Sequence, residues 1–118
     1  MASGEKVDPA DAWRASSAAV RMLMGAGPPV TAGVTRGGRR SDPATAWRRK
    51  LAIYTAVVGL GAGVKPMRPF MGVQHSAAYE VLHRMEEARD TPAIDQLLDL
   101  LKAEAERQMA AVASRRAA

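Results

Sequence analysis

Residues 47–85 carry the pattern that most restricts the fold of this chain. Two apolar stretches, at residues 51–58 and 64–71, are each followed by glycine, and a group of small polar residues at positions 74–76 follows Gly72. A short helix, a tight turn with glycine and a second helix that opens with small polar residues form a helix-turn-helix, which places side chains in the major groove of DNA. We therefore expect a helix-turn-helix within this segment.

The composition favours helices over strands. Hydrophobic residues make up 47% of the 118 residues but aromatic residues only 4%, so that Ala, Leu, Val and Met supply most of the apolar volume. Because aromatic and β-branched side chains favour strands, their scarcity indicates packed helices. The absence of cysteine excludes disulfides, thiolate metal sites and cysteine nucleophiles. We predict an all-α fold of about five helices.

Three of the predicted helices begin with Asp or Thr followed by Pro, at residues 8–9, 42–43 and 91–92. The side-chain oxygen can cap free backbone N–H groups, and Pro fits the first helical turn. The expected helices cover residues 9–24, 43–58, 64–71, 74–89 and 91–108. The expected parts of the chain are an N-terminal amphipathic helix (1–24), a Gly/Pro/Arg linker with a basic loop (25–41), a helix-turn-helix DNA-binding domain (42–108) and a frayed tail (109–118).

Apolar residues recur at helical spacing and predict the inner face of each longer helix. For the two tryptophans, this placement favours core packing over stacking on bases. The last helix has more apolar surface than one inner stripe requires, which suggests a partner or a homodimer interface on this helix. The predicted inner residues are Trp13, Val20, Leu23 and Met24; Trp47, Leu51, Tyr54 and Val58; Ala78, Val81, Leu82 and Met85; and Ile94, Leu97, Leu98 and Leu101.

The positive charge is concentrated in one third of the chain. The net charge is +5, yet residues 36–70 contain eight Lys and Arg residues and only one acidic residue, Asp42. Residues 1–35 are neutral overall, and residues 71–118 are net negative. Such focused charge beside the predicted helix-turn-helix indicates a polyanionic partner. A solvated basic face is the alternative.

Two segments, RRKLAIY and MGVQHSAAYEVLHRMEE, resemble the C-terminal duplex-DNA-binding domain of the bacterial replication initiator DnaA. That family has a run like R-Q-x-A-M-Y-L-A, a short helix ending in F-G, then R-D-H-T-T-V and a helix closing in K-I-E. Residues 49–54 are similar to the first run, Met71-Gly72 stands where F-G is expected, and residues 73–78 stand for R-D-H-T-T-V. Residues 84–86 close the helix. The similarity covers about residues 36–105.

The resemblance implies a fold and a mode of binding. In the family, the R-D-H-T-T residues start a recognition helix in the major groove, and an upstream basic loop reaches the minor groove. Here His75 is retained and Ser76 is a conservative change, whereas Val73, Gln74 and Ala77 replace Arg, Asp and Thr. We therefore expect the fold but not the initiator's own recognition sequence. The resemblance extends to stand-alone alphaproteobacterial regulators of the gene transfer agent activator type.

The candidate contacts fall into phosphate, minor-groove and base-reading groups. The basic triplet at residues 48–50 is expected to hold phosphates, with surface solubility as the alternative. The arginines of residues 36–40 lie among glycines and can enter a narrow minor groove, or form a solvated loop. Gln74 can pair with adenine, and Ser76 with a base or phosphate, unless they only cap the helix. The candidate DNA-binding residues are Arg36, Arg39, Arg40, Arg48, Arg49, Lys50, Lys65, Arg68, Gln74, His75, Ser76 and Tyr79.

Other chemistry is not indicated. His75 and His83 are eight residues apart on one helix and point roughly 80° apart, so they cannot chelate a metal together. The glycines of residues 59–63 lack the Lys-Ser/Thr of a phosphate-binding loop and are expected to end a helix. We expect no cofactor, no metal and no enzymatic activity. Glu80, Glu86, Glu87 and Asp90 are expected to form a solvated acidic face.

These patterns predict a sequence-specific, double-stranded DNA-binding transcription regulator, cytoplasmic and associated with the nucleoid. No apolar run approaches the roughly 20 residues that span a bilayer, and no secretory signal is recognised. The alternatives are an adaptor whose first and last helices bind a protein partner, such as a second subunit or an RNA polymerase-associated factor, and a nucleoid- or replication-associated nucleic-acid-binding protein.

Overall fold

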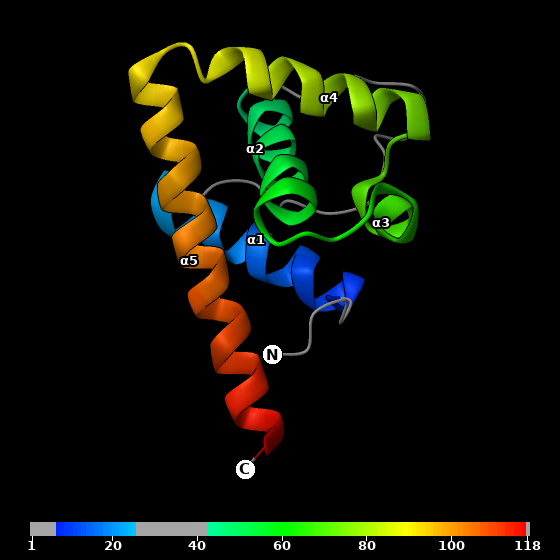
Figure 1. Ribbon diagram of the computed structural model, residues 1–118, viewed down its shortest axis with the longest axis vertical. Helices are drawn as coiled ribbons and strands as arrows, with labels where there is room; N and C mark the ends of the chain where they lie inside the picture. Colours follow the sequence, from blue (N-terminus) through cyan, green and yellow to red (C-terminus); the bar gives the residue numbers. More distant parts are fainter. Residues whose placement is uncertain (1–6, 26–42, 118) are drawn as a thin grey trace.

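The protein is all-α in the computed structural model, which describes residues 7–25 and 43–117 (Figure 1). No strand occurs within these two ranges. The basic loop and the linker predicted between residues 25 and 41 therefore lie almost wholly outside the described residues. The elements are α1 (Pro9–Met24), α2 (Pro43–Tyr54), the π-helical turn η2 (Thr55–Gly59), α3 (Val64–Met71), α4 (His75–Ala88) and α5 (Pro92–Ala117).

The continuous helix formed by α2 and η2 lies at the centre of the molecule. In Figure 1, α4 runs across one end of α2 and α5 descends along one side, while α1 crosses both α2 and α5. The short helix α3 packs against α1 and the start of α4. The predicted central position of the helix formed by α2 and η2 is confirmed for residues 51–56, all of which are buried.

The first helix is part of this core and not an appendage to it. Trp13 and Val20 are buried in the same apolar cluster as Leu51 and Leu101, as predicted for the inner face of α1. The prediction for Leu23 on that face is wrong: Leu23 is 40% exposed, because ten residues after Trp13 its side chain lies roughly 80° away around the helix. Burying a large side chain such as Val or Trp stabilises a fold by roughly 1.5–3 kcal/mol. The helices on either side of residues 26–42 therefore belong to one folding unit.

One apolar prediction in the central helix is wrong. Val58 is 44% exposed, although its spacing from Leu51 and Tyr54 predicted a buried position. The helix widens over Thr55–Gly59, where the Leu60 N–H donates to the Thr55 carbonyl five residues before it. A π-helical turn holds an extra residue, so the side chains after Tyr54 rotate out of the α-helical register. Val58 is thereby turned toward solvent.

The last helix is longer than predicted. We expected it to end near Gln108, with residues 109–118 frayed, but α5 continues to Ala117. Alanine, the strongest helix former, is abundant in residues 109–117. The end of α5 is also tied to α1, because the Arg116 guanidinium donates to both Asp11 carboxylate oxygens, at 2.6 and 3.1 Å. Asp11 is buried, so this contact draws the end of α5 onto the start of α1.

Candidate nucleic-acid interface

A tight turn after α3 sets the direction of α4. Gly72 ends α3 with a φ of 71°, in the left-handed region that glycine adopts without strain. Met67 and Met71 anchor α3 in the core, and Ala78 and Met85, seven residues apart, anchor α4. Because each helix buries one face, the opposite face of the first two turns of α4 remains open to solvent.

Two adjoining surface depressions lie where α3, the turn at Gly72 and the start of α4 meet. The larger has a volume of about 710 Å³ and is lined by Arg68, Gln74, His75, Ser76 and Tyr79. The smaller, of about 510 Å³, shares Arg68 and Gln74 and adds Lys65 from α3 and the Gly72–Val73 turn. No carboxylate lines either depression. The fold thus brings together six of the twelve candidate residues: Lys65, Arg68, Gln74, His75, Ser76 and Tyr79.

The polar groups at the start of α4 have no capping hydrogen bond from a side chain of the described residues. Gln74 occupies the N-cap position, but its side chain makes no capping hydrogen bond. The first turn of α4 also contains no acidic residue. The first backbone N–H groups of a helix have no partner inside the helix and attract anions. The Gln74 amide and these N–H groups are therefore both available to an external ligand.

His75 and Tyr79 lie one helical turn apart and form an aromatic pair on the open face. Their ring centroids are 5.0 Å apart and the ring planes are tilted by 37°. Both residues are exposed, with Tyr79 at 54%. The two rings together present an aromatic surface on the open face of α4.

The basic triplet at residues 48–50 is placed differently from the six candidate residues that line the depressions. Arg48 and Arg49 are half-buried, and only Lys50 of the triplet is exposed. The Arg48 Nη2 donates to the Met24 carbonyl at 3.4 Å, and the Nε atoms of both arginines have no partner among the described residues. None of the triplet lines either depression. The described residues thus give Arg48 a tie to the end of α1, while Arg36, Arg39 and Arg40 lie outside them.

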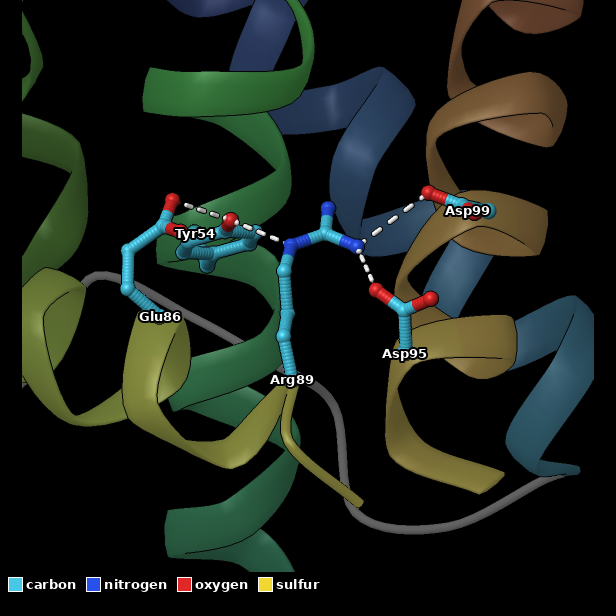
Figure 2. Close-up of polar contacts among 5 residues, drawn as sticks. All are labelled: Tyr54, Glu86, Arg89, Asp95 and Asp99. Atoms are coloured by element: carbon cyan, nitrogen blue, oxygen red, sulfur yellow. Dashed lines mark hydrogen bonds and ion pairs between the residues drawn. The ribbon is translucent and has the colours of Figure 1, made fainter. Parts of the chain in front are cut away.

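A polar network holds the far end of α4 against α2 and α5 (Figure 2). The buried Tyr54 hydroxyl donates to Glu86 at 2.5 Å and accepts from Arg89 Nε at 2.9 Å. The Arg89 guanidinium also donates to Asp95 at 2.6 Å and to Asp99 at 3.2 Å, and its carbon lies 5.4 Å from the Tyr54 ring centroid. Hydrogen bonds to Tyr54 and Asp95 raise the pKa of Arg89 further above its ordinary value. This network fixes the orientation of α4 from its C-terminal end. It therefore also fixes the position of the first turns of α4, which carry the open face.

Sequence reasoning missed this network. Glu86 was expected on a solvated acidic face, and it remains exposed, but its carboxylate accepts the hydrogen bond of a buried tyrosine. Asp95 and Asp99 stand four residues apart, a spacing that places two carboxylates on one helix face. That spacing was the available signal, whereas the partner, Arg89, becomes evident only once α4 and α5 are placed.

No protein-family model, curated protein or solved structure matches this chain. The likeness to the initiator's DNA-binding domain therefore depends on the quoted sequence segments.

The described part of the chain holds no group of three or more His, Asp or Glu residues arranged to bind a metal ion. None of its helices combines the length and the hydropathy that crossing a membrane requires.

Replacing Tyr54 by Phe is expected to lower the free energy of unfolding by about 1–2 kcal/mol, since one buried hydroxyl joins two charged groups. Burial, followed by the hydrogen bond to Glu86, raises the pKa of the Tyr54 hydroxyl, and Arg89 opposes this. A raised pKa means that the protonated hydroxyl stabilises the fold. This contribution is complete below about pH 10 and is lost as the pH rises through the folded-state pKa.

Urea denaturation at a series of pH values tests this expectation. Wild-type stability should fall more steeply above about pH 10 than that of Tyr54→Phe. Tyr79→Phe, which removes an exposed hydroxyl, is the matched control and should follow the wild type. Parallel curves for wild type and Tyr54→Phe would contradict the assignment.

Proposed function

We propose that this protein is a sequence-specific, duplex-DNA-binding transcription regulator that reads the major groove with the first turns of α4. One observation carries the proposal: Gln74, His75, Ser76 and Tyr79 are exposed together in one depression with Arg68. Side chains that can read base edges thus stand beside a phosphate-binding cation at the start of a helix. The lack of a carboxylate among the lining residues fits a polyanionic ligand.

In this proposal, α3 contacts phosphates and the start of α4 contacts bases. Lys65 and Arg68 on α3, both exposed, hold phosphates and position the protein without reading sequence. Gln74 pairs with the N6 and N7 of an adenine, and Ser76 donates to a base or phosphate. The basic triplet at residues 48–50 and the arginines of residues 36–40 supply further phosphate and minor-groove contacts.

The resemblance to the initiator's DNA-binding domain supports this reading. Val73, Gln74 and Ala77 replace residues that the family uses for base reading, so the proposed operator differs from the initiator's site. We accordingly propose transcriptional control, in the manner of the gene transfer agent activators, over replication initiation, and a nucleoid-associated place in the cytoplasm.

The adaptor hypothesis has less support from the packing. It requires the apolar faces of the first and last helices, but α1 and α5 pack on each other and bury Val20, Leu98 and Leu101. Leu100, which is 50% exposed, is the large apolar side chain that α5 leaves to solvent within the described residues. A homodimer or a protein partner on α5 would centre on this residue.

Selection of duplexes from a random library tests the proposal. The wild-type protein should enrich one motif, and Gln74→Ala should lose preference at one or two base pairs, by about 5- to 150-fold, since a bidentate pair is worth roughly 1–3 kcal/mol. Binding to unrelated duplexes should barely change. Gln96→Ala, an exposed glutamine on α5, is the matched control and should enrich the wild-type motif. Enrichment of no motif, or of the initiator's own site, would overturn the proposal.

A further inference from the structure

The open face of α4 exposes an aromatic side chain that the fold does not use. The core face of α4 is formed by Ala78 and Met85, and Tyr79 points away from it, 54% exposed. The centroid of the Tyr79 ring lies 5.0 Å from that of the His75 ring, and Tyr79 lines the same depression as Gln74 and Arg68. A large aromatic surface at a polar binding face is suited to an apolar feature of the ligand.

We propose that the Tyr79 ring contacts the C5-methyl group of a thymine in the major groove, and that this contact sets part of the sequence preference. This inference rests on the proposed function. Of the four bases, only thymine presents a methyl group in the major groove, and proteins read it by apolar contact. The neighbouring Arg68 and the absence of carboxylates in the depression are complementary to the phosphates on either side.

The spacing along α4 limits where this thymine lies. Gln74 and Tyr79 are five residues apart, which at roughly 1.5 Å per residue separates them by about 7.5 Å along the helix axis. Successive bases of one strand are about 3.4 Å apart. The thymine therefore lies within about two base-pair steps of the adenine that Gln74 reads, on either strand.

Uracil substitution isolates the methyl group, because uracil pairs like thymine and lacks only that group. Each thymine of the motif selected by the wild-type protein is replaced by uracil in turn, and affinities are measured at one salt concentration. At one position, within two steps of the Gln74-dependent base pair, the wild-type affinity should fall about 4-fold, the value of one buried methyl group. Other positions should change less.

Two variants then assign the methyl contact. Tyr79→Ala should bind the thymine duplex about 4-fold more weakly than the wild type and show no further loss with uracil. Tyr79→Phe keeps the ring and should retain the full uracil penalty. Both substitutions are on an exposed helical position, and thermal unfolding of each variant verifies that it is folded.

The outcomes separate this inference from the proposed function. If the loss of affinity with uracil persists in Tyr79→Ala, or if no uracil substitution weakens wild-type binding, the thymine contact is overturned. The proposed function then still stands. The absence of any selected duplex motif overturns both. Tighter binding of single strands than of the selected duplex, lost in Tyr79→Ala, would assign the ring to base stacking and also overturn the inference.

Discussion

Raising the salt concentration from 50 to 200 mM should weaken duplex binding by about 250- to 1000-fold. This follows from a log–log slope of about −4 to −5, which corresponds to roughly four to six neutralised phosphates. Lys65→Ala combined with Arg68→Ala should reduce the magnitude of the slope by about 2 and weaken all sequences similarly, since each phosphate contact contributes about 0.9. Both residues are exposed and line the depressions, so a reduced salt slope reports on their contact with DNA.

A charge-matched control distinguishes these contacts from a general effect of charge. Arg21→Ala combined with Lys102→Ala also removes one Arg and one Lys, both exposed, from α1 and α5. This control should retain the wild-type slope. Equal slopes for the two double variants would mean that Lys65 and Arg68 act only through net charge, and would contradict the proposed orientation of α3 on DNA. The half-buried Arg48 and Arg49 give a less direct test, because their loss also affects packing.

Replacing Trp13 by Ala should destabilise the fold by about 3–5 kcal/mol, the range for truncating a buried Trp. Trp13 is only 7% exposed and lies in the cluster that contains Leu51, Met67 and Leu101. Urea denaturation followed by circular dichroism measures the effect. For a domain of ordinary stability, a change of this size takes most of the free energy of unfolding.

Met22→Ala is the control for Trp13, because Met22 lies on the same helix and is exposed. Its effect should be within about 0.5 kcal/mol. Removal of α1 altogether should leave the remaining helices without a cooperative unfolding transition, because α1 covers α2, α3 and α5. A truncated chain that melts like the full one would show that α1 is not part of the core.

The helices and their starts follow from local sequence. Asp8 caps α1 by accepting from the Asp11 N–H at 3.0 Å, as the Asp-Pro pair predicted, and Gly72 ends α3 in the left-handed conformation. Caps, turns and helical spacing depend on residues within one or two turns of each other, so they can be read without knowledge of the fold. The grouping of Gln74, His75 and Ser76 at the start of α4 was likewise predictable.

What the sequence by itself determined is therefore the helical content and the polar opening of α4. The tertiary structure decided which helices share a core, how far α5 continues, and which cations remain exposed. The Tyr54–Arg89 network, the Asp11–Arg116 pair and the half-burial of Arg48 join residues 24 to 105 positions apart. Such contacts depend on how helices pack, because a charged side chain has many possible partners until distant elements are brought within hydrogen-bonding distance.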